Sequence, residues 1–133
     1  MKELEYPFDA AYIIKKRKSL KKALLADGTS RIRKKIAVFG GSTTSDIVKT
    51  LELFLLDAGI EPEFYESEYA QYFQDAMFPD ETLLSFKPDI VFIHTTNRNV
   101  TDWPEMTDTT KQIDEKLHTE INRFTAMWKS IAE

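Results

Sequence analysis

Apolar residues form short unbroken runs at two places in the chain, and such runs predict buried β-strands. Residues 35–39 (KIAVF) end at Gly40-Gly41, and residues 89–94 (DIVFIH) follow Pro88. A weaker signal, Glu63-Phe64-Tyr65, predicts a further strand between them. An unbroken apolar run such as Ile90–Ile93 is typical of a strand that is covered on both faces.

Between the strands, apolar residues recur every three or four positions, which predicts amphipathic helices. Asp9 is a good N-cap and Gly28 a good stop for the first helix. The last helix has the clearest seam, formed by Ile113, Leu117, Ile121, Phe124, Trp128 and Ile131. We expect helices at 9–26, 45–58, 68–77, 80–86 and 107–132.

Strands that alternate with helices predict parallel β-α-β units with right-handed crossovers. The strand order is then 2-1-3, within a three-layer α/β/α sandwich whose sheet is incomplete, because doubly wound sheets usually have about five strands. The third strand is left at an edge. The chain is then either a fragment of a larger domain or is completed by another copy through the third strand and the C-terminal helix; we expect a fragment that also forms a homo-oligomer. The expected domains are a basic helical arm, 1–34, and a partial α/β domain, 35–133.

Charge is unevenly distributed. Residues 1–35 carry a balance of +7 and residues 36–133 a balance of −11, so the net charge of −4 conceals a basic arm and an acidic body. No row of aromatic residues accompanies the lysines, which favours a protein partner over nucleic acid. The 133 residues contain no cysteine, no apolar run of about 20 residues and no secretory signal, so we expect no disulfide, no membrane partner and a cytoplasmic location.

The strongest local signal for chemistry follows the first strand. Gly40, Gly41, Ser42, Thr43 and Thr44 lie between that strand and a helix, where open α/β sheets bind ligands. The glycines and the helix start could hold an anion, or Ser42 could act as a nucleophile with backbone amides as an oxyanion hole. The remaining alternative is that Thr44 or Ser45 only caps the helix.

A second polar segment follows the third strand at the same edge of the sheet, where the parallel strands have their carboxyl ends; we call this edge the rim. His94 could act as a base, Asn97 could donate to an oxyanion, and Arg98 beside Thr96 could hold a carboxylate or phosphate. Glu66, after the second strand, could line the same cleft. With two histidines and no metal-ligand spacing, no metal site is expected, nor any other cofactor.

These rim residues carry a family resemblance. KIAVFGGSTTS (35–45), Tyr65-Glu66-Ser67, Lys87-Pro88-Asp89 and Thr96-Asn97-Arg98 resemble the N-terminal region of FkbH-like proteins, of subfamily IIIC of the haloacid dehalogenase superfamily. That region is similar to SGNH hydrolases and precedes a phosphatase-like domain. The resemblance implies an SGNH/flavodoxin-like sandwich and a role in acyl transfer, with relatives in polyketide or surface-polysaccharide biosynthesis.

Ser42 matches the nucleophile position of the SGNH pattern and Asn97 the oxyanion-hole asparagine. The Asp-x-x-His block that supplies the base has no counterpart, nor does the Asp-x-Asp motif of the phosphatase-like domain. We therefore predict a domain that binds an acyl or phosphorylated ligand, free or linked to a carrier protein, without turnover by itself. The alternatives are a hydrolase or acyltransferase using Ser42 with His94, and a protein-protein interaction module.

Overall fold

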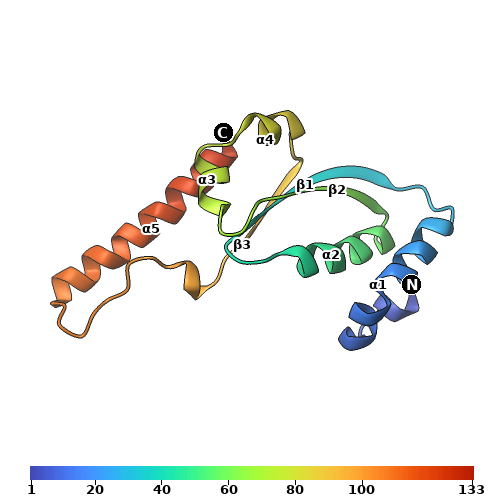
Figure 1. Ribbon diagram of the computed structural model, residues 1–133, viewed down its shortest axis with the longest axis horizontal. Helices are drawn as coiled ribbons and strands as arrows, with labels where there is room; N and C mark the ends of the chain where they lie inside the picture. Colours follow the sequence, from blue (N-terminus) through green and yellow to red (C-terminus); the bar gives the residue numbers. More distant parts are fainter.

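Three parallel strands form the middle layer of the computed structural model, which describes residues 1–133 (Figure 1). The strands are β1 (Ile32–Gly40), β2 (Ile60–Glu66) and β3 (Ile90–His94), in the order β2-β1-β3. The expected order 2-1-3 is confirmed. Strand β1 starts three residues before the apolar run because residues 32–34 pair with residues 60–62 of β2. The expected boundary after residue 34 therefore falls within β1.

Helices cover both faces of this sheet. Helix α2 (Ser45–Asp57) covers one face, and α1 (Ala10–Ala26) packs against α2 on the side away from the sheet. The other face is covered by α3 (Tyr72–Met77), α4 (Glu81–Phe86) and the C-terminal half of α5 (Thr110–Ala132). Short 3-10 turns occur at Lys2–Leu4 (η1) and Asn97–Asn99 (η2). The chain is thus the α/β/α sandwich that its sequence predicts, with a three-stranded sheet.

Successive side chains of β1 point to opposite faces of the sheet and so contribute to two separate parts of the core. Ile36 and Val38 point toward Val48 of α2, whereas Ala37 and Phe39 point toward the α3–α5 side and contact Met127. Because β1 is the central strand and helices pack over both of its faces, these four side chains are buried. This central strand holds the rim that follows Gly40 in place.

Helix α1 begins and ends where its sequence signals predict. The Asp9 side chain accepts a hydrogen bond from the backbone N–H of Tyr12, and Gly28 adopts a positive φ of 71° just after the helix. The buried residues of α1 pack between the two helices, so the arm is part of the folded body. They and their partners on α2 are Ile13, Leu20, Leu24, Leu53 and Leu56.

One part of the sheet is less covered than the apolar pattern predicts. On β3, Ile90 and Phe92 lie on the α2 side of the sheet but remain exposed, because α2 packs over β1 and β2. The prediction that this strand is covered on both faces is wrong. The expected helix at 68–77 is also shorter, since α3 starts only at Tyr72. None of the helices is both long and apolar enough to span a membrane.

Candidate functional site

The two glycines after β1 allow the loops after β1 and β3 to meet closely. The backbone N–H of Gly41 donates to the carbonyl oxygen of His94 (2.9 Å), and the Asn99 amide Nδ2 donates to the carbonyl oxygen of Gly41 (3.0 Å). A Cβ on Gly41 would collide with the Asn99 side chain, and one on Gly40 with the Thr44 side chain. Glycine is therefore required at both positions by close approach of neighbouring groups.

Backbone N–H groups have no hydrogen-bond acceptor where this loop enters α2. From Ser42 to Ile47 none of them donates a hydrogen bond within the chain, and the first that does is Val48, to the carbonyl of Thr44. Thr44 stands at the N-cap, but its hydroxyl donates to Glu66 Oε1 (2.8 Å) instead of accepting from the helix. The helix start thus presents donors and the positive end of its dipole to the rim.

The loop after β3 is ordered by its own side chains. The Thr96 hydroxyl accepts from the N–H of Arg98 (3.2 Å), and the N–H of Thr96 donates to Asn99 Oδ1 (2.8 Å). Asn99, which the sequence reasoning did not select, is therefore the residue that joins this loop to Gly41. Asn97 is exposed and makes no side-chain hydrogen bond.

Ser42 and His94 come from neighbouring segments, but no hydrogen bond joins their side chains. His94 lies opposite Gly40 in the register, and its ring centroid is 6.3 Å from that of Phe92. The Ser42 hydroxyl has no hydrogen-bond partner in the chain. Thr43 beside it is exposed. No side chain of this geometry is therefore hydrogen-bonded to the Ser42 hydroxyl as a base would be.

A buried polar network supports the rim from the α5 side. The Arg123 guanidinium donates to the Asn99 carbonyl (2.6 Å), to the Tyr72 hydroxyl (2.8 Å) and to Glu120 Oε2 (2.9 Å). Glu120 Oε1 also accepts from the Thr101 hydroxyl (2.6 Å). The guanidinium carbon lies 4.7 Å from the ring centroid of Phe124. Arg123 thus positions Asn99, which in turn holds Gly41.

The ionisation of this network follows from its contacts. Burial opposes ionisation of Glu120, but hydrogen bonds from Thr101 and Arg123 outweigh it and lower the pKa of Glu120 below its ordinary value of 4.5. Burial likewise opposes the charge of Arg123, and the bonds to Tyr72 and Glu120 outweigh it, so the pKa of Arg123 is raised. Both groups are held in their charged forms.

Sequence signals for this network existed but were weak. Glu120 and Arg123 are three residues apart on the predicted last helix, which places them on one side as an ion pair. Asn99 is two positions beyond the asparagine that the sequence pattern favoured. What spacing did not give was the contact between α5 and the β3 loop, because that depends on the tertiary arrangement.

A cavity of about 400 Å³ adjoins the rim beside Asn99. Arg98 and Arg123 lie on its wall, and Arg98 makes no ion pair. Of the residues that the sequence singles out for the site, only Arg98 lines it; Gly41 contacts His94 and Thr44 contacts Glu66 at the loops above, whereas Ser42, Thr43 and Asn97 make no side-chain hydrogen bond there. The lining residues are Ala70, Tyr72, Phe73, Gln74, Arg98, Asn99, Thr101 and Arg123.

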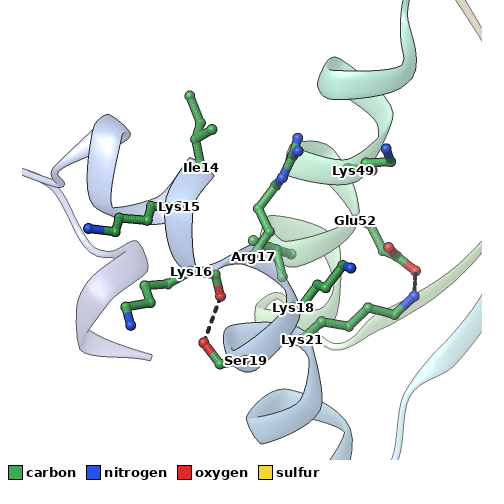
Figure 2. Close-up of a pocket in the computed structure, with 10 residues that line it drawn as sticks. Ile14, Lys15, Lys16, Arg17, Lys18, Ser19, Lys21, Lys49 and Glu52 are labelled. Carbon is green, nitrogen blue, oxygen red and sulfur yellow. Dashed lines mark hydrogen bonds and ion pairs between the residues drawn. The ribbon is translucent and has the colours of Figure 1, made fainter.

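A separate basic groove of about 650 Å³ lies along α1 and α2. Figure 2 shows Arg17, Lys18 and Lys21 directed toward α2, where Lys21 meets Glu52 (2.7 Å). Arg17 pairs with Asp46 at the start of α2 (2.8 Å). The cations of this groove that have no ion pair are Lys15, Lys16, Lys18 and Lys49.

No three or more His, Asp or Glu side chains gather anywhere in the chain as a set of metal ligands.

Neither a family model nor a curated protein matches the sequence. Among solved structures, the fold is similar to the N-terminal part of the protein BF1531 from Bacteroides fragilis, a crystal structure described as containing a phosphatase domain complexed with Mg. The TM-score is 0.63 at 20% identity, over 84% of this chain and 29% of that one. The likeness shows the fold, and the chain spans less than a third of that neighbour.

Proposed function

We propose that the rim formed by the loops after β1 and β3 binds an acyl or phosphorylated group, free or linked to a carrier protein, without turnover by this chain alone. One observation carries the proposal: six consecutive backbone N–H groups, from Ser42 to Ile47, have no acceptor within the chain. Such a row at a helix start is suited to oxygen atoms of a phosphate or a carbonyl.

The charges around this row also favour an anion. Asp46 lies in the first turn of α2 and would repel an anion, but it is paired with Arg17 (2.8 Å). Arg98, at the adjoining cavity, has no anionic partner and can supply a charge-assisted hydrogen bond. The helix dipole and Arg98 thus favour an anion, whereas the Glu66 carboxylate, which accepts from the Thr44 hydroxyl at the helix start (2.8 Å), opposes it.

The wider context supports a binding domain within a larger protein. The sequence resembles the N-terminal region of FkbH-like proteins, and the fold is similar to part of a longer chain that contains a phosphatase domain. The chain itself has neither an Asp-x-Asp motif nor an Asp-x-x-His block. In this proposal the chain is an SGNH-like domain that presents a ligand to catalytic groups outside it.

Amide chemical shifts test ligand binding directly. We expect 4′-phosphopantetheine, and more weakly inorganic phosphate, to shift the N–H signals of residues 42–47. Arg98→Gln should weaken binding several-fold because it removes a charged donor. Arg33→Gln is the matched control, since that side chain is exposed at the opposite end of β1. Shifts confined to the lysines of α1 would contradict the proposal.

A fluorophosphonate serine probe tests the absence of turnover. We expect no covalent adduct by intact mass on the folded chain, because no base contacts the Ser42 hydroxyl. An adduct that disappears in Ser42→Ala would instead establish the hydrolase alternative. Loss of the adduct in His94→Ala as well would identify His94 as its base.

A further inference from the structure

Helix α5 carries an apolar stripe that the rest of the chain leaves bare. An α-helix turns about 100° per residue, so Ile113, Leu117, Ile121 and Trp128 fall within a sector of about 80°. They are between 38% and 58% exposed. Figure 1 shows the first half of α5 extending away from the sheet, beyond contact with the other helices.

The residues that attach α5 to the rest of the chain lie mainly beside the stripe. Met127 is fully buried against α3 and the sheet, and Glu120 and Arg123 belong to the network beneath the rim. These three residues lie on one flank of the stripe, and Phe124 and Ile131, at the edge of the stripe on that flank, pack against the same core cluster as Met127. The stripe itself therefore faces outward while its helix is held in place.

We propose that two copies of the chain associate through this stripe, with their α5 helices antiparallel about a twofold axis near Ile121. In that arrangement Ile121 meets its own copy, and Ile113 meets Trp128 of the other copy. A twofold interface is self-complementary, so each contact occurs twice. Antiparallel packing covers the stripe over the whole length of the helix.

Charges beside the stripe favour a second copy in this direction. Asp114 and Lys129 lie on the same flank at opposite ends of α5. Antiparallel packing therefore brings Asp114 of one copy close to Lys129 of the other copy. Neither side chain makes an ion pair within the chain.

The open edge of β3 is the other surface through which two copies could associate. Ile90 and Phe92 are exposed there, but they lie on the α2 side of the sheet, whereas α5 covers the opposite face. No flanking pair of opposite charges comparable to that of α5 accompanies them. We therefore assign the contact to α5.

Sedimentation equilibrium over the micromolar range tests the interface. We expect a dimer for the unmodified chain and at least a tenfold weaker one for Ile121→Asp, because two carboxylates would meet at the axis. Phe92→Asp is the control, since it alters an exposed apolar residue outside the stripe, and should leave the dimer unchanged. Both variants should keep the unmodified chain's helical circular dichroism. A monomer throughout the range, or dissociation by Phe92→Asp only, would overturn the proposal.

Two further measurements test the antiparallel direction. Because the chain has no cysteine, Ile121→Cys should form a disulfide-linked dimer on oxidation, whereas Ile113→Cys should link only when mixed with Trp128→Cys. Self-linking of Ile113→Cys would indicate parallel helices and contradict the proposal. Asp114→Lys and Lys129→Asp should each weaken the dimer, and an equal mixture of the two should restore it.

Discussion

Helices α1 and α5 both carry an apolar stripe, yet they are attached to the rest of the chain in different ways. The stripe of α1 is buried against leucines of α2, and its ion pairs lie outside the apolar contact. The stripe of α5 is bare, and α5 is held instead by Met127 together with a charged network around Arg123. One attachment is thus mainly apolar, whereas the other combines apolar burial with charge.

This difference predicts different sensitivities for the two helices. Apolar burial responds to loss of volume and is nearly independent of pH and salt. A buried charged network responds to removal of one partner and to protonation of its carboxylate. Substitutions in the two attachments should therefore lower the unfolding free energy by different amounts, and these losses should depend differently on pH and salt.

The largest effect is expected from Leu53→Ala, which creates a cavity between α1 and α2. Leu53 is 1% exposed, and truncating such a side chain costs about 2–5 kcal/mol of unfolding free energy. Urea denaturation followed by circular dichroism measures this loss.

Leu117→Ala is the matched control on α5, where the same side chain is 56% exposed. Measured on dilute protein, it should change the unfolding free energy by no more than about 0.5 kcal/mol. An equal loss in the two variants would mean that the stripe of α5 is buried and would remove the distinction between the helices.

A smaller effect is expected from Arg123→Ala, which leaves Glu120 buried without its cation. The loss should be about 1–3 kcal/mol, because an unpaired buried group keeps its desolvation cost. The Asn99 carbonyl also loses its donor, so binding at the rim should weaken in the same variant. Arg98→Ala, at a residue with no ion pair, should leave the unfolding free energy within about 0.5 kcal/mol.

Acid should loosen α5 before α1. The pKa of Glu120 is lower in the folded chain than its ordinary value of 4.5, so its stabilising contribution is complete above that value and is lost as the pH falls through the folded pKa. The pKa of Asp46 is also lowered, by Arg17, but its side chain is 85% exposed and solvent screens the pair.

Hydrogen exchange between neutral pH and pH 3 would detect this order. Amides of α5 should lose protection first, and Glu120→Gln should flatten the acid dependence of the unfolding free energy. Simultaneous loss of protection in α1 would contradict it.

The sequence was sufficient to predict the order of the strands and helices, but not which element packs against each apolar face. Alternating strands and helices predicted the order 2-1-3, and Asp9 and Gly28 predicted the ends of α1. Periodicity identified the apolar side of α5, yet it could not show that burial would occur on the neighbouring side, through Glu120 and Met127. Which element covers a stripe is decided by tertiary packing.

The candidate site was predictable to the same extent. Gly40-Gly41 between a strand and a helix predicted the rim, because open α/β sheets bind ligands at the carboxyl ends of their strands. Asn99 could not be chosen over Asn97 from the sequence, since the choice depends on how the turn after β3 closes on Gly41. Arg123 comes from a helix 24 residues further on, and only the fold brings it to the Asn99 carbonyl.

The smallest effect is expected at the ion pairs of α1. Lys21→Gln removes the contact with Glu52, but the Lys21 side chain is 44% exposed, and such surface pairs contribute no more than about 1 kcal/mol. Lys18→Gln is the matched control, because that lysine has no ion pair. The difference between the two variants should shrink in high salt, which screens exposed charges. A loss from Lys21→Gln as large as that from Leu53→Ala, or one that salt leaves unchanged, would show that charge rather than apolar burial attaches α1.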